Sequence, residues 1–186
     1  MSSAAEPAVV AHRTVYRAVV MGVSGSGKSS LGEALAARLG VPFADADDFH
    51  PAHNVEKMSQ GVPLTDADRE PWLETVGQWL AEHSDGGVMA CSALRRAYRD
   101  RLRRYVPEVP FLHPYGKASV VLERMTQRSA TTDHFMPVSL VESQYATLEP
   151  LDDDEAGVTL DLLRSVDELV EDSVAYLHGR RGRSHR

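Results

Sequence analysis

Residues 22–29 carry the motif that most constrains how this chain can fold. They read Gly-Val-Ser-Gly-Ser-Gly-Lys-Ser and match the pattern G-x-x-x-x-G-K-[ST] of a phosphate-binding P-loop. The glycines let the backbone bend into a nest whose N–H groups point at phosphate oxygens. Lys28 places a positive charge beside the β- and γ-phosphates, and the Ser29 hydroxyl is a natural Mg²⁺ ligand. The motif therefore predicts a site for a nucleoside triphosphate bound with Mg²⁺.

The sequence on either side of the motif distinguishes a working P-loop from a chance match in a Gly/Ser-rich turn. Residues 15–21 before it are β-prone and mostly apolar, as expected for a buried parallel strand. After it, Leu31, Leu35 and Leu39 recur at helical spacing, and Gly40 ends the pattern. Strand, loop and helix thus follow in the order that a P-loop requires. The expected nucleotide-binding residues of the loop are Gly22, Ser24, Gly25, Ser26, Gly27, Lys28, Ser29 and Ser30.

Strand-like segments alternate with helical patterns along the chain. They lie at residues 16–23, 42–45, 87–90, 110–115 and 157–161. Such alternation predicts an α/β fold of βαβ units, in which a parallel sheet carries helices on both faces. Because ligands of such sheets bind at the carboxyl ends of the strands, we expect the functional residues to follow the strands directly.

Composition narrows the class of protein. A length of 186 residues fits one domain. No segment approaches the ~20 apolar residues of a membrane span, and the N-terminus lacks the pattern of a signal peptide. The single cysteine, Cys91, excludes an internal disulfide and favours a cytoplasmic location, and we expect it to be a small buried residue. The net charge of −7 disfavours a nucleic-acid partner.

The domain boundaries follow from the same pattern. We expect residues 14–178 to form a single P-loop domain, preceded by a disordered segment at residues 1–13. Residues 179–186 form a basic tail that is expected to be disordered and solvated. Residues 47–68 are too polar and irregular for a simple connection and end in a helix start at Thr65. Residues 128–137 lie between two helical stretches, where small-molecule kinases keep a mobile lid.

Two carboxylates follow the second predicted strand. Asp45 and Asp47 are two residues apart, so their side chains project in opposite senses and can do different work. One could hold Mg²⁺ through its waters, and the other could accept a proton from a substrate hydroxyl. The alternative is a solvated acidic turn, which carries about equal weight on this segment alone. Because a P-loop is also present, the functional interpretation of the two carboxylates is favoured over the solvated turn.

Arginines after the second and third predicted strands could bind an anion. Arg69 has a planar fork suited to a carboxylate or a pair of hydroxyls, although a surface salt bridge with Asp66 or Glu70 is the commoner fate of such a residue. Arg95 and Arg96 could bind a sugar acid or simply form a basic helix face. Both alternatives stay open at this point.

A second pair of arginines precedes the predicted lid. Arg124 and Arg128 lie four residues apart on one helix face. From there they could lean over the triphosphate and stabilise the charge that spreads over a transferred phosphoryl group. The alternative is ordinary exposure of a long helix face to solvent. The histidines show no zinc-ligand spacing, so no zinc site is predicted.

With these motifs in place, the chain resembles the bacterial gluconokinases. The resemblance covers residues from about 16 to 178, nearly the whole chain. It rests on the P-loop, Asp45-x-Asp47, His50-Pro51, Asn54-x-x-Lys57-Met58, Gly61-x-Pro63-Leu64, Asp68-Arg69-x-Pro71-Trp72-Leu73, Cys91-Ser92-Ala93-Leu94, Tyr98-Arg99-Asp100, His134-Phe135 and Gln144.

The resemblance implies an activity and an architecture. The activity is that of an ATP-dependent kinase, which phosphorylates the 6-hydroxyl of D-gluconate and releases 6-phospho-D-gluconate and ADP. The architecture is a P-loop NTPase fold of the nucleoside-monophosphate-kinase-like type, with three layers, a central five-stranded parallel sheet and a short lid. The family also implies a homodimer.

Roles carried over from the family assign the site. Lys28 and Ser29 would hold phosphate and Mg²⁺, and Asp45 would position hydrated Mg²⁺. The expected gluconate-binding residues are Asp47, His50, Arg69, Arg95 or Arg96, His134 and Gln144. Arg124 and Arg128 would line the nucleotide side, and the expected catalytic residues are Lys28, Asp47 and Arg128.

Two other functions stay open on the residues alone. A kinase of another small polyol acid, such as shikimate, would share the phosphate machinery and differ in the acceptor pocket. A nucleotide switch or ATPase module would act through a protein partner. The common GTPase motif N-K-x-D is absent, because Asn54 is the only asparagine and Val55 follows it.

Overall fold

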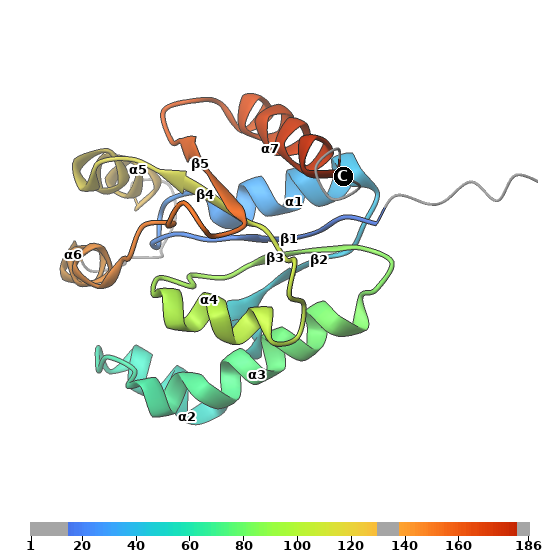
Figure 1. Cartoon of the computed structure of the whole chain (residues 1–186). Helices are drawn as coiled ribbons and strands as arrows, with labels where there is room; N and C mark the ends of the chain where they lie inside the picture. Colours follow the sequence, from blue (N-terminus) through green and yellow to red (C-terminus); the bar gives the residue numbers. More distant parts are fainter. Residues whose placement is uncertain (1–14, 130–137, 182–186) are drawn as a thin grey trace, which may run out of the picture.

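The computed structural model describes residues 15–129 and 138–181, and a single parallel sheet forms the centre of that part of the chain (Figure 1). The strands are β1 (Arg17–Val20), β2 (Phe43–Asp45), β3 (Gly87–Ala90), β4 (Phe111–Tyr115) and β5 (Gly157–Asp161), in the order β2-β3-β1-β4-β5. Each neighbouring pair is parallel. The five-stranded parallel sheet predicted from the sequence is confirmed, although the first strand ends earlier than expected, at Val20.

Helices cover both faces of the sheet (Figure 1). The bounds of the principal helices are α1 (Lys28–Leu39), α3 (Asp66–Glu82), α4 (Arg96–Arg103) and α7 (Val166–Arg181). One face packs on α1 and α7, and the other packs on α3 and α4. The remaining helices are a 3-10 turn at Ala46–Phe49, α2 (Ala52–Ser59), α5 (Ala118–Ser129) and α6 (Val138–Thr147).

The alternation of side chains along β1 explains why both faces are covered. Val19 packs with the apolar side chains of α3 and α4, whereas Ala18 and Val20 pack with those of α1 and α7. All three are fully buried. Successive strand residues point to opposite faces, so an uninterrupted apolar run requires two covering layers.

The segment from 47 to 68 contains more helix than its polar sequence predicted. A 3-10 turn and α2 occupy half of it. The expected helix start at Thr65 is confirmed, because Thr65 caps α3 in a reciprocal capping box with Asp68. At the other end of the chain, α7 continues to Arg181, into the predicted basic tail. The predicted segment 1–13, residues 130–137 of the predicted lid and residues 182–186 lie outside the described residues.

A buried ion pair ties α4 to the loop before β5. Arg99 and Glu155 have fully buried side chains, and the guanidinium donates to both carboxylate oxygens at 2.6 and 2.8 Å. Arg99 also donates to the carbonyls of Ala93, Leu94 and Glu149 at 3.1–3.3 Å. Burial alone would raise the pKa of Glu155, but hydrogen bonds from Arg99 and a neighbouring arginine lower it to about 2.

None of the helices in the described ranges is long and apolar enough to cross a membrane.

Cys91 directly follows β3 and is fully buried in the core. Its predicted role as a small buried residue is therefore confirmed. Desolvation raises the pKa of the Cys91 thiol to about 12, so the reactive thiolate form is scarce at neutral pH.

Glu155→Ala should destabilise the fold strongly, because it leaves the Arg99 charge buried without its partner. Removing one member of a buried pair typically costs about 3–5 kcal/mol. The free energy of unfolding in urea measures this loss. Asp154→Ala, which removes an exposed carboxylate one residue away, serves as the matched control and should cost much less.

The same pair predicts a pH dependence. The pKa of Glu155 falls from 4.5 to about 2 on folding, so its contribution to stability is fully present above pH 4.5 and is lost as the pH drops toward 2. Urea unfolding of wild type and Glu155→Ala should therefore converge across this window. Curves that stay parallel down to pH 2 would contradict this account of the pair.

Cys91 should not react with a thiol reagent such as DTNB in the folded protein, because it is buried and protonated. Unfolding in guanidinium should release one equivalent of thiol, since the chain has a single cysteine. Rapid stoichiometric labelling of the native protein would show that the thiol is accessible after all.

Candidate active site

The P-loop leaves the carboxyl end of β1, the central strand of the sheet. Gly22, Gly25 and Gly27 have φ values of 143°, 80° and 81°. Residues other than glycine rarely adopt these backbone angles. Lys28 begins α1 directly after the loop and is only 8% exposed. The first N–H groups of a helix have no partner within it, so this end of α1 offers donors to a phosphate. The backbone here therefore has the geometry that the predicted phosphate site requires.

Ser29, near the start of α1, and Asp45, at the end of β2, contact each other beside the P-loop. The Ser29 hydroxyl donates to one carboxylate oxygen of Asp45 at 2.6 Å, and the other oxygen accepts from the backbone N–H of Asp47 at 3.0 Å. No group of three or more histidine, cysteine or acidic side chains among the described residues could hold a metal by itself. One hydroxyl and one carboxylate fit Mg²⁺ that arrives with phosphate and keeps several waters.

His50 lies against Asp47 and is held there by its neighbours. Its ring stacks on Trp72 at a centroid distance of 4.3 Å, and the Asn54 amide nitrogen is 3.4 Å from its Nδ1. This contact assigns Nδ1 as the acceptor and leaves the proton on Nε2, which lies 4.0 Å from Asp47 Oδ1. Burial, opposed by the charge of Asp47, lowers the pKa of His50, so the ring is neutral at neutral pH.

Asp47 itself is open to a substrate. Its side chain is 67% exposed, in contrast to the 6% of His50. The 3-10 turn that carries Asp47 is held by α3, because the Trp72 indole N–H donates to the Ala46 carbonyl at 2.6 Å. An exposed carboxylate on a fixed backbone is suited to orient a substrate hydroxyl and to accept its proton.

Arg69 and Arg95 converge on an exposed carboxylate. Asp66 lies 3.8 Å from Arg69 and 3.3 Å from Arg95, and it accepts from the Tyr98 hydroxyl at 2.5 Å. Both guanidinium carbons lie over the Tyr98 ring, at 5.6 and 5.9 Å from its centroid. The salt bridge considered for Arg69 thus forms with Asp66, whereas Glu70 pairs with Arg101. This arrangement, the Arg69–Arg95 cluster, already holds a carboxylate and could take one from a substrate.

Arg96 does not join that cluster. Its guanidinium pairs with Asp152, Asp154 and Asp100 at 2.9, 2.7 and 3.6 Å. Its backbone N–H donates to Glu149. The side chain therefore serves as a link to the loop before β5, and of the two arginines only Arg95 belongs to the Arg69–Arg95 cluster.

The predicted lid-side residues are only partly described. Arg124 donates to the Leu162 carbonyl at 2.6 Å. The side chain of Arg128 and the whole of His134 lie outside the described residues. Gln144, on α6, contacts the P-loop: it accepts from the Ser24 N–H at 2.6 Å and donates to the Ser24 hydroxyl at 3.2 Å. The structure therefore brings Gln144 to the nucleotide loop and not to the Arg69–Arg95 cluster.

Several residues around the site were not assigned functional roles from the sequence. Asn54 orients His50, Trp72 stacks on it, and Tyr98 and Asp66 hold the two arginines. Tyr98 lies three residues after Arg95 and therefore near the same helix face, which is the one signal that could have indicated it. Asn54 is only four residues after His50, whereas the contacts of Trp72 with His50 and of Asp66 with Arg95 join segments far apart in the chain.

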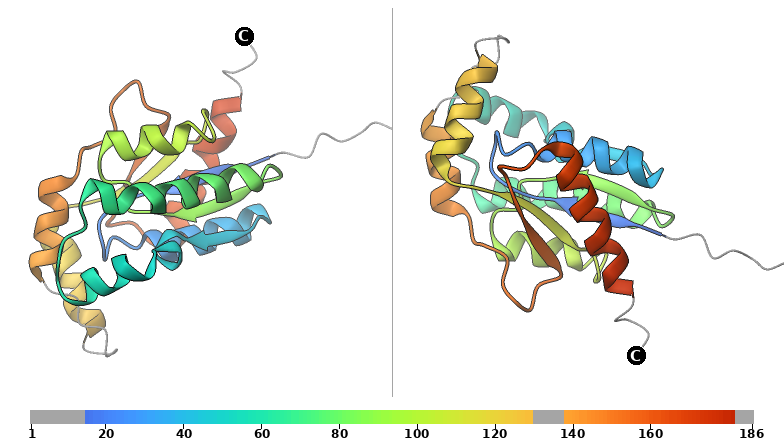
Figure 2. Two further views of the ribbon diagram at one scale, coloured as in Figure 1. Left: turned by 90° about the horizontal axis from the view of Figure 1, so that it is seen from below. Right: turned by 90° about the horizontal axis from the view of Figure 1, so that it is seen from above.

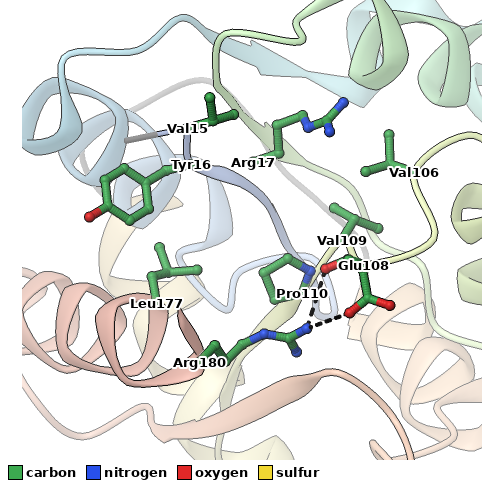
Figure 3. Close-up of a pocket in the computed structure, with 9 residues that line it drawn as sticks. All are labelled: Val15, Tyr16, Arg17, Val106, Glu108, Val109, Pro110, Leu177 and Arg180. Atoms are coloured by element: carbon green, nitrogen blue, oxygen red, sulfur yellow. Dashed lines mark hydrogen bonds and ion pairs between the residues drawn. The ribbon is translucent and has the colours of Figure 1, made fainter. Parts of the chain in front are cut away.

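A pocket of about 290 Å³ lies at the opposite, amino-terminal edge of the sheet (Figure 3). Its lining comes from the start of β1, the segment before β4 and the end of α7. Arg180 reaches from α7 to Glu108 at 3.3 Å. The pocket is therefore separate from the P-loop and from the Asp45–Asp47 segment, which lie at the carboxyl ends of the strands.

Comparison with known proteins shows which families the chain resembles. The model of the shikimate kinase family matches residues 24–155. The chain is 43% identical to the thermosensitive gluconokinase of Escherichia coli, over 82% of each chain. It is 44% identical to the gluconokinase of Gluconobacter oxydans, over 85% of this chain and 89% of the relative.

A solved structure agrees with these relatives. The crystal structure of a gluconokinase from Sinorhizobium meliloti superposes with a TM-score of 0.81 at 44% identity, covering 93% of this chain and 99% of that one. The resemblance read from the motifs is thereby confirmed. The chain belongs to the gluconokinase family, and most of it also matches the shikimate kinase model.

Proposed function

We propose that this protein transfers the γ-phosphoryl group of ATP to the 6-hydroxyl of D-gluconate, giving 6-phospho-D-gluconate and ADP. The observation that carries the proposal is the continuity of the site. The Ser29–Asp45 contact joins the P-loop to the exposed carboxylate of Asp47, and His50 connects Asp47 to the side on which Arg69 lies. The P-loop and Arg69 thus both lie near the segment that carries Asp47 and His50.

The chain's own groups account for the donor side of the reaction. The P-loop N–H groups and Lys28 hold the β- and γ-phosphates. Mg²⁺, which Ser29 would hold directly and Asp45 through water, neutralises phosphate charge when it is bound with ATP. Arg124 and Arg128 are proposed to lie on the nucleotide side, where arginine would stabilise the charge of the transferred group.

The acceptor side uses Asp47 and the Arg69–Arg95 cluster. The two arginines bind the carboxylate of gluconate in place of Asp66, which orients the sugar acid with its 6-hydroxyl toward Asp47. The hydroxyl oxygen then bonds to the γ-phosphorus while the bond to the bridging oxygen of ADP breaks. Asp47 takes the hydroxyl proton, and no covalent enzyme intermediate forms. His134 completes the proposed set of acceptor ligands.

Three further features belong to the proposal. A homodimer follows from the family resemblance, and a cytoplasmic location fits the single, reduced cysteine. Residues 128–137 are proposed to act as a lid within one kinase domain spanning residues 14–178. Closure of such a lid excludes water, so ATP hydrolysis without an acceptor should be slow.

A coupled ADP-release assay tests the proposed function. The assay uses Mg·ATP with D-gluconate, other aldonates, shikimate or no acceptor. We expect ADP release with gluconate and almost none without an acceptor. Release with shikimate or another acid alone would overturn the assignment of the acceptor, and full-rate hydrolysis without any acceptor would favour an ATPase module that acts through a partner.

Asp47→Asn should lower kcat by about 10²-fold or more, because it removes the proton acceptor of the substrate hydroxyl. The KM for ATP should change little, since no hydrogen bond or ion pair joins the Asp47 side chain to the P-loop in the described part of the chain. Steady-state kinetics measure both values, and Asp48→Asn, at an exposed neighbouring carboxylate, is the matched control. Wild-type turnover of Asp47→Asn would remove the base role.

Arg95→Ala should raise the KM for gluconate by about tenfold or more, because it removes a charge-assisted hydrogen bond to the substrate carboxylate. Arg96→Ala is the matched comparison, since its guanidinium is already paired with three carboxylates of this chain. We expect its KM for gluconate to stay close to the wild-type value. The reverse ranking of the two variants would assign the acid ligand to Arg96.

A further inference from the structure

We propose that Gln144 is a positioning residue, which holds the P-loop in its nucleotide-binding shape and does not bind the sugar acid. This differs from the substrate-binding role that the family resemblance implies for it. The inference rests on the proposed function only in taking an adenine nucleotide with Mg²⁺ as the ligand of the P-loop. It is carried by the contacts of Gln144, by the loop residue that it contacts and by the anchoring of its helix.

Both polar ends of the Gln144 side chain are engaged with one P-loop residue. The amide oxygen accepts from the Ser24 N–H at 2.6 Å, and the amide nitrogen donates to the Ser24 hydroxyl at 3.2 Å. Two bonds from one planar amide determine the position and the orientation of Ser24 together. The side chain is thus committed to the loop rather than aimed at the Arg69–Arg95 cluster.

A contact at Ser24 bears directly on the shape of the loop. It directly precedes Gly25, whose φ of 80° turns the chain into the phosphate nest. Hydrogen bonding of the Ser24 N–H orients the peptide plane that enters this turn. A nest binds phosphate well only if its N–H groups are already aligned, because aligning them during binding would cost conformational entropy.

A second helix supports the same turn from outside. A Cβ atom at Gly25 would lie 2.6 Å from Met125 Cγ and 3.1 Å from Val121, so α5 packs directly on the glycine backbone. The helices α5 and α6 lie side by side at the P-loop end of the sheet (Figure 2). The loop is therefore braced by an apolar contact from α5 and by a polar contact from α6.

The helix that carries Gln144 is itself anchored. Val141 is fully buried and packs with Val23 and Leu94. One turn later, Tyr145 donates to the Gly116 carbonyl at 2.9 Å. Beyond the end of α6, the Glu149 N–H donates to the Leu94 carbonyl at 2.8 Å, in the loop that leads to Arg95. A fixed helix can hold a loop in place, whereas a mobile one could not.

Binding of Mg·ADP in the absence of any acceptor tests the proposal. We expect Gln144→Ala to raise the Kd for Mg·ADP by about tenfold in isothermal titration calorimetry, because two hydrogen bonds to the loop are lost. Gln144→Met, which keeps the length of the side chain but cannot make both bonds, should weaken binding similarly. Glu142→Gln, an exposed change on the same helix, is the control and should bind Mg·ADP as wild type does.

Steady-state kinetics with D-gluconate separate this role from a substrate-binding one. At saturating ATP, the KM for gluconate of Gln144→Ala should match wild type, while the KM for ATP rises. Normal Mg·ADP binding combined with a raised KM for gluconate would overturn the proposal and return Gln144 to the acceptor site. Tighter Mg·ADP binding would also overturn it, because Gln144 would then compete with phosphate for the Ser24 N–H.

The calorimetric result does not depend on the acceptor being gluconate. If the protein proved inactive with gluconate, the difference between Gln144→Met and Glu142→Gln in Mg·ADP binding would still decide the role of Gln144. Thermal unfolding of each variant verifies that it is folded. If Gln144→Ala fails to fold, Gln144→Met, which preserves packing volume, carries the test, and wild-type Mg·ADP affinity in that variant would overturn the proposal.

Discussion

Burial of β1 on both faces is the constraint on which the rest of the structure depends. Ala18, Val19 and Val20 have no exposed surface, and their strand lies between β3 and β4. The chain can leave such a strand only at its end, so the P-loop emerges where the carboxyl ends of the neighbouring strands also meet. The P-loop, Asp45 and Asp47 are gathered at this edge as a consequence. The pocket at the amino-terminal edge lies at the far end of the same strand (Figure 3).

Three arginines within five residues have different roles, because each has different neighbours in the folded structure. Arg99 is fully buried against Glu155 and holds two loops together. Arg96 is exposed but paired with three carboxylates. Arg95 has a side chain that is 42% exposed and shares Asp66 with Arg69. Only a guanidinium that is accessible and can exchange its carboxylate partner is suited to bind an acid, and Arg95 meets both conditions.

The support of the P-loop connects the two halves of the site. Gln144 contacts Ser24, and the residues after α6 contact the loop that leads to Arg95. Contacts from α6 and from the residues that follow it thus reach both the P-loop and the loop that leads to Arg95. On the side of the proposed acceptor, Asn54 and Trp72 have a corresponding role, because they hold His50 beside Asp47.

The sequence by itself determined the parallel sheet, the P-loop and the position of Asp45 and Asp47, because these depend on local patterns. Apolar runs specify strands, glycines permit the turns of the nest, and residues that follow strands must lie at one edge. The Arg95–Asp66 pair, the contact of Gln144 with Ser24 and the buried Arg99–Glu155 pair were decided by the tertiary structure alone. Each joins segments between 29 and 120 residues apart, and no local pattern records which distant partner a polar side chain will meet.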